Sequence, residues 1–101
     1  MADPRIARLV ARLGSGSDRE REAAAWELVH LAAGNDANKE EIRRQGGIKA
    51  LVALVRGGGA DAQAIATAAL GLLADGNDAA KEKFRSQGGI EALVALVRGG
   101  G

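Results

Sequence analysis

The chain repeats part of its own sequence at a fixed distance. Residues 46–59 read GGIKALVALVRGGG and residues 88–101 read GGIEALVALVRGGG, so these two stretches differ only at Lys49 and Glu91. The offset is 42 residues (88 minus 46), and it continues without a gap through the rest of the sequence. A period of roughly 20 to 50 residues is typical of chains built from stacked units, each of which buries its apolar face against its neighbours. The repeat therefore predicts a stacked fold with an extended exposed surface.

The composition favours helices and excludes several classes of function. Hydrophobic residues make up 47% of the chain, and Trp26 and Phe84 are the only aromatic ones. Ala and Leu are strong helix formers, and the net charge of +1 gives little attraction for nucleic acid or an anionic membrane. The sequence has no Cys, no apolar signal segment at its N-terminus and no apolar run of about 20 residues. We expect a soluble chain, of cytoplasmic type if natural, with no cofactor and no nucleic-acid or membrane partner.

Apolar spacing and turn residues divide the chain into short helices. Ser17 followed by Glu20 is typical of a capping box at a helix start, and Gly34 is typical of a helix end. The pair Gly46 and Gly47 predicts a sharp corner, because Gly accepts a positive φ without steric cost. The predicted helices span residues of about 4–13, 17–33, 35–45, 48–56, 60–75, 78–87 and 90–98. Each 42-residue unit thus combines a short charged helix, a medium apolar helix and a long helix.

Apolar residues recur at the same positions of successive units, and these positions are the predicted core. The matched sets are Ile6, Ile48 and Ile90; Leu9, Leu51 and Leu93; Val10, Val52 and Val94; Leu28 and Leu70; Leu31 and Leu73; Ala32 and Ala74; and Ile42 and Phe84.

Three segments, in this order along the chain, resemble armadillo repeats. They are EAAAWELVHLA at residues 22–32, GNDANK at 34–39 and GGIKALVALV at 46–55. The resemblance implies an all-α, right-handed superhelix (solenoid) of about two armadillo repeats plus one extra helix. We expect one domain over residues 1–101. Its parts are an N-capping first repeat without its first helix (1–45), a second repeat in a shifted frame (46–87) and a truncated third unit (88–101).

In that family the long helices line a concave groove that binds extended peptides through ladders of Trp and Asn. The resemblance places the Trp position at Trp26 and the Asn position at His30, whereas Ala68 and Leu72 stand there one period later. The ladder Asn is therefore absent from both units. Trp26 is either a binding anchor or a residue packed between long helices. His30 is either a hydrogen-bonding group of the groove or an exposed residue without a role.

Small apolar residues occupy the predicted groove face of the second long helix. Gly71 inside this helix costs about 1 kcal/mol relative to Ala, which a close approach by another helix would explain. An apolar patch of this kind often marks an interaction site. The predicted groove and interface residues are Trp26, Val29, His30, Ala64, Ala68, Gly71 and Leu72.

The two ends of the array differ in polarity. Arg8 and Arg12 stand where the next unit has Ala50 and Leu54, as expected of an N-terminal cap. The helix at 90–98 has no long helix after it. Leaving roughly 200 to 300 Å² of its apolar surface open would cost about 5 to 8 kcal/mol at about 25 cal/mol per Å². The predicted open-end interface consists of Leu93, Leu96 and Val97.

These features predict a non-enzymatic protein–protein interaction scaffold. The near identity of the repeats and the absence of Cys favour a designed or consensus-derived sequence. The leading hypothesis is self-association, with a homodimer favoured, through the open C-terminal helix and the apolar concave face. The alternative is a peptide-binding armadillo module or fragment that uses the groove of the long helices. A single His, no Cys and no recognisable catalytic order of residues argue against an enzyme or a metal site.

Overall fold

The computed structural model describes residues 1–74, 82, 85–86, 88–89 and 98. All of the helices with defined bounds lie in the first of these ranges, and they match the predicted helices to within about two residues at each end. They are α1 (Ile6–Leu13), α2 (Asp18–Ala32), α3 (Asp36–Arg44), α4 (Gly47–Gly57) and α5 (Ala60–Ala74). The all-α class is thereby confirmed for the described residues. The predicted helices at 78–87 and 90–98 fall mostly on residues outside them.

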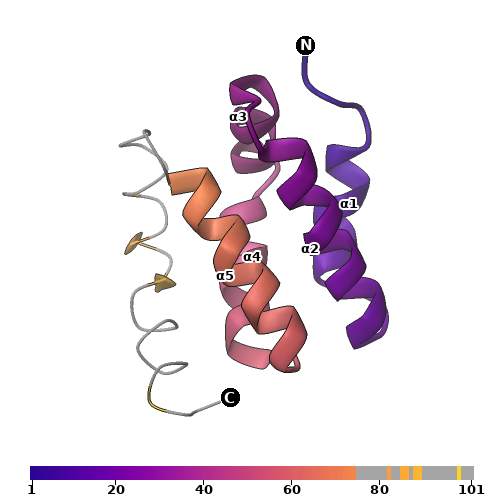
Figure 1. The fold of residues 1–101 in the computed structure, drawn as a ribbon, viewed down its shortest axis with the longest axis vertical. Coiled ribbons are helices and arrows are strands. Elements are labelled where there is room, and N and C mark those ends of the chain that lie inside the picture. The colour runs from indigo at the N-terminus through magenta and orange to yellow at the C-terminus, as the bar shows by residue number, and fades with distance from the viewer. Residues whose placement is uncertain (75–81, 83–84, 87, 90–97, 99–101) are drawn as a thin grey trace.

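The long helices α2 and α5 lie side by side and run in the same direction (Figure 1). α1 packs against α2 and α4 packs against α5, while α3 lies at one end of the molecule (Figure 1). The pair formed by α1 and α2 is thus repeated by α4 and α5, one period later in the sequence. The repeat in the sequence is therefore a repeat in the structure, whereas the superhelical course of a longer array stays a prediction.

The helix starts and ends follow from local hydrogen bonds that the sequence predicts. The backbone N–H of Glu20 donates to Ser17 Oγ, and the backbone N–H of Ser17 donates to Glu20 Oε1, both at 3.2 Å. This capping box satisfies two donors that the first turn of α2 would otherwise leave unpaired. Gly34 has φ +67 just after α2, and Asn35 Oδ1 accepts the backbone N–H of Asn38 at 3.0 Å to cap α3.

The two glycines between α3 and α4 are required for different reasons. Gly46 has φ +85, and its period-matched residue Gly88 has φ +81, so both adopt the left-handed conformation that Gly tolerates best. At Gly47, a Cβ would lie 2.4 Å from Ile42 Cγ2 and 2.7 Å from the Ile42 carbonyl oxygen. The predicted corner is confirmed, and the close approach at Gly47 lets α3 pack onto the start of α4.

The core is made of the period-matched apolar residues together with the small residues of the long helices. Leu31 and Ala74 are only half-buried, whereas the other matched residues within 1–74 are buried. The buried matched residues are Ile6, Leu9, Val10, Leu28, Ala32, Ile42, Ile48, Leu51, Val52, Leu70 and Leu73. The predicted core is therefore confirmed in this range, apart from these two partly covered positions.

The first and second units differ in how far two equivalent positions are exposed to solvent, as the sequence predicts. Leu54 in α4 is only 1% exposed and Ala50 packs against the core, whereas Arg8 and Arg12 are exposed on α1. The positions that the first unit leaves to solvent are thus covered in the second unit. Arg at these positions satisfies the need for a polar outer face at an uncovered surface.

Asn38 is a buried polar residue whose role the sequence did not reveal. Its side-chain oxygen accepts the backbone N–H of Asp3 at 2.8 Å, and its amide nitrogen donates to the Leu31 carbonyl oxygen at 2.8 Å. Buried polar groups are stable only when paired, and here both ends of the amide are. Asn38 therefore ties the N-terminal segment, the end of α2 and the start of α3 together.

Candidate protein-binding groove

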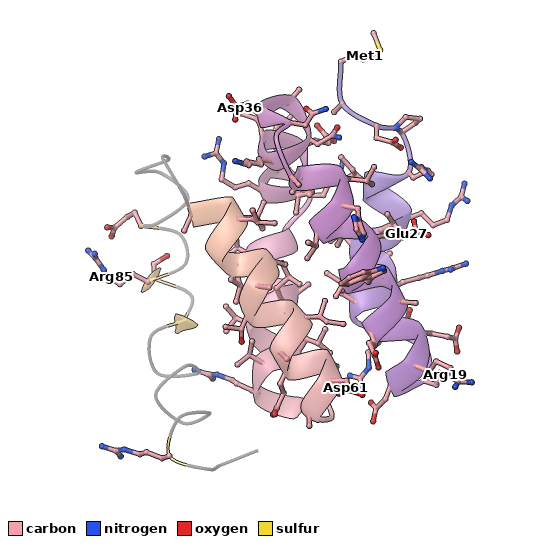
Figure 2. All side chains as sticks on the ribbon, in the orientation of Figure 1. Met1, Arg19, Glu27, Asp36, Asp61 and Arg85 are labelled. Carbon is pink, nitrogen blue, oxygen red and sulfur yellow. The ribbon has the colours of Figure 1, made fainter. Side chains whose placement is uncertain are left out.

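A shallow depression of about 540 Å³ lies between the two long helices. Trp26 lines it from α2, and Ile65 faces it from α5. Arg19 and Asp61 lie toward the same end of the molecule, where both helices begin (Figure 2). The complete lining consists of Arg19, Glu22, Ala23, Trp26, Asp61 and Ile65.

Among the described residues, Trp26 is the most exposed large apolar side chain after the terminal Met1, with 54% of its surface accessible. The His30 ring meets it edge-on, with the ring centroids 4.5 Å apart and the ring planes at 84°. One helical turn separates the two residues, so this contact holds the indole from one side. Trp26 is therefore not buried between the long helices, which favours the interpretation as a binding anchor over that of a packing residue.

The polar rim of the groove was not predicted from the sequence. It carries Arg19 and Glu22 on α2 and Asp61 on α5, around the apolar surface of Trp26 and Ile65. Two signals in the sequence pointed to these residues. Arg19 and Glu22 are seven and four residues before Trp26, on the same helix face, and Asp61 follows Arg19 by one period.

The other predicted interface residues lie outside the lining of the depression. Val29 is half-buried against the core and His30 is exposed beside Trp26. On α5, the side chains of Ala64 and Ala68 are exposed, Gly71 is exposed and Leu72 is half-buried. The predicted open-end residues Leu93, Leu96 and Val97 lie outside the described residues.

In the described part of the chain, two carboxyl groups have displaced pKa values, and both stabilise local structure away from the groove. Hydrogen bonds from the side chain and backbone of Arg5 lower the pKa of Asp3 to about 2. Backbone and side-chain hydrogen bonds from Ser17 lower the pKa of Glu20. A lowered pKa is expected of a carboxylate that accepts hydrogen bonds. Both carboxylates lie near the start of a helix, Asp3 before α1 and Glu20 in the first turn of α2.

In the part of the chain that the structure describes, no group of three or more His, Cys, Asp or Glu side chains is placed to hold a metal ion. No helix in the described residues is long and apolar enough to cross a membrane.

A comparison with protein families matches residues 35–75 to the armadillo/beta-catenin-like repeat. This segment contains α3, α4 and α5, which are the short, medium and long helices of one complete unit. This part of the chain is therefore similar to one armadillo repeat. Armadillo repeats are generally protein-interaction modules and typically have no enzymatic activity. No curated protein and no solved structure matches the chain.

Proposed function

We propose that the chain is a non-enzymatic interaction module that holds an extended segment of a partner protein in the groove between α2 and α5. The observation that carries this proposal is the exposure of Trp26 above the depression, next to the apolar side chain of Ile65. Trp is enriched among the residues that dominate binding energy at protein interfaces. An apolar centre with Arg19, Glu22 and Asp61 around it also resembles the usual arrangement of an interface, with a polar rim.

The groove differs from an armadillo groove that binds peptide backbones through Asn side chains. His30 and Leu72 occupy the two ladder positions, so no side-chain amide stands there to pair with the main chain of a partner. We therefore propose that the partner's side chains, above all an apolar one seated on Trp26, supply most of the affinity. His30 supports this arrangement, because its contact fixes the position of the indole before binding and so reduces the entropy lost.

The test is a selection of random twelve-residue peptides displayed on phage against the purified protein, followed by calorimetry. Trp26→Ala should weaken the selected peptides at least about 30-fold, because a hot-spot residue contributes about 2 kcal/mol or more. Ala53→Glu is the matched control, since Ala53 is exposed on α4 outside the lining of the depression. The control should bind as the parent does. If the parent and Trp26→Ala bind the selected peptides with affinities within twofold, the proposal is wrong.

Self-association is a second candidate function, favoured by one observation on α5. Asp61 is the only charged residue in this 15-residue helix, although part of the helix surface is exposed. We also propose a designed or consensus-derived origin, supported by the near identity of the two 14-residue segments. We propose as well a homodimer, a superhelical course of the array and a division of the chain after residues 45 and 87.

A further inference from the structure

The internal repeat places opposite charges at equivalent positions of the two long helices. Arg19 of α2 and Asp61 of α5 are one period apart, both side chains are exposed and both line the groove. They lie at the end of the molecule where the two helices begin (Figure 2). A segment that crosses the groove from α2 to α5 at this end therefore passes from a positive charge to a negative one.

Neither charge is neutralised within the described part of the chain. The ion pairs between described residues include neither Arg19 nor Asp61. Asp18, which precedes Arg19 in the sequence, is paired with Arg21 instead. Both side chains at the groove are thus available to an opposite charge on a bound partner.

The other contacts that the groove offers do not favour one direction of a bound chain. The two ladder positions are His30 and Leu72, so no side-chain amide there fixes the direction of a partner's backbone. Trp26 and Ile65 offer apolar surface, and the attraction of apolar surfaces has no direction. The unlike charges of Arg19 and Asp61 supply the polarity that these contacts lack.

From these observations we infer that Arg19 and Asp61 set the direction in which a partner segment crosses the groove, with an acidic side chain of the segment at Arg19 and a basic one at Asp61. This inference rests on the proposed binding groove and names the charge pattern of the partner.

The geometry of an extended chain fixes the spacing of this pattern. Side chains that face the same way stand at every second residue, about 7 Å apart. An acidic residue, an apolar residue for Trp26 and a basic residue therefore stand at alternate positions, and the two charged residues are about 13 Å apart. This span exceeds the roughly 8 to 10 Å between packed helices by less than the length of an arginine side chain.

Glu22 also lines the groove, but it belongs to the same side as Arg19. It follows Arg19 by three residues on α2, and its side chain is half-buried, whereas those of Arg19 and Asp61 are exposed. Its carboxylate lowers the net charge of the α2 side without making the α5 side positive. Glu22 thus weakens the polarity of the groove and does not reverse it, so Glu22→Gln should leave the direction unchanged.

The first experiment tests the charge pattern with three nine-residue peptides that are blocked at both ends, so that no terminal charge interferes. Each peptide has Leu at its centre and a charged residue two positions to either side. The mixed peptide has Glu and Lys at these places, the second has two Glu and the third has two Lys. Calorimetry at low salt should show that the parent binds the mixed peptide about fivefold more tightly than either of the others, which is the effect of one exposed ion pair.

Single charge reversals should change the preferred peptide. Arg19→Glu leaves carboxylates on both sides of the groove and should prefer the peptide with two Lys, whereas Asp61→Lys should prefer the peptide with two Glu. Lys49→Glu is the matched control, because it changes the net charge as Arg19→Glu does, and Lys49 is exposed on α4 outside the lining. The control should keep the preference of the parent. The same preferred peptide in the parent and in both groove variants would overturn the inference.

The second experiment measures the direction itself. A nitroxide on the first residue of the mixed peptide, with Glu before Lys, should broaden the backbone amide of Ala23 on α2 more than that of Ala64 on α5. A double variant that combines Arg19→Asp with Asp61→Arg should still bind this peptide and should reverse the order of broadening. The same order in the parent and the double variant would show that other contacts set the direction.

These outcomes are distinct from the test of the groove. The phage-selected peptides show whether binding depends on Trp26. If it does, while the parent and the reversal variants share one preference or bind none of the three designed peptides, the charge pattern is wrong and the groove stands. If no selected peptide depends on Trp26, the groove and the charge pattern are both wrong.

Discussion

Replacing Leu54 by Ala should destabilise the fold far more than the same truncation one period earlier, at Arg12. Leu54 is 1% exposed, so the change removes a buried isobutyl group and leaves a cavity. Truncations of this kind cost about 2 to 5 kcal/mol. Arg12 is exposed, and truncating it should change the free energy of unfolding by less than about 0.5 kcal/mol. For a domain of this size, a loss of about 3 kcal/mol lowers the melting temperature by roughly 12 to 24 °C.

The assay is urea denaturation followed by circular dichroism, at a concentration where the parent is a single chain. Leu54→Ala should lower the urea midpoint without changing the slope of the transition, because the surface exposed on unfolding hardly changes. Arg12→Ala should leave the midpoint in place. Equal shifts for the two variants would refute the reasoning, since they would mean that Leu54 is covered no better in the second unit than Arg12 is in the first.

Three further predictions concern stability and ionisation. Gly47→Ala should destabilise by about 1 to 3 kcal/mol in the same assay, because its Cβ would overlap Ile42 of α3. Gly71→Ala should stabilise the single chain by up to about 1 kcal/mol, because a Cβ there meets no described atom within 4 Å. The opposite order of stability would contradict the close approach at Gly47 and the open space at Gly71. Asn38→Ala should cost about 1 to 3 kcal/mol, because the Leu31 carbonyl loses its donor and the backbone N–H of Asp3 loses its acceptor. The loss at Asp3 should speed hydrogen exchange in the N-terminal segment, and unchanged exchange would show that Asn38 does not hold this segment. The pKa of Asp3, lowered to about 2 from its usual 3.8, means that its carboxylate stabilises the fold above pH 3.8 and that this contribution is lost as the pH falls through about 2. In Arg5→Ala, carboxyl carbon-13 shifts should show the pKa of Asp3 closer to 3.8, and an unchanged midpoint would show that the Arg5 side chain is not the main cause.

The parts of the fold that the sequence predicts are those that recur with the period. The matched positions of Ile6 and Ile48 predict core, and the Ser17 cap and the Gly46 corner each follow from a local pattern. Asn38 was missed because its partner Asp3 is 35 residues away and no local pattern encodes that contact.

The groove was predictable only in part, for a related reason. Trp26 carries a signal of its own, because an isolated Trp on the polar side of a helix needs a role. Asp61 and Ile65 line the depression only because α5 lies close beside α2, and that distance depends on the packing of Ala25, Ala62 and their neighbours. Helix spacing of this kind is a tertiary property, which periodicity alone does not give.

The most direct test of the binding groove is the indole N–H resonance of Trp26 during titration with a selected peptide. The chain has one Trp, so one indole signal reports on the groove. The groove predicts a saturable shift of this signal, together with the backbone amides of Asp61 and Ile65. A peptide that binds by calorimetry and leaves the indole and both amides unmoved would show that the chain recognises its partners elsewhere.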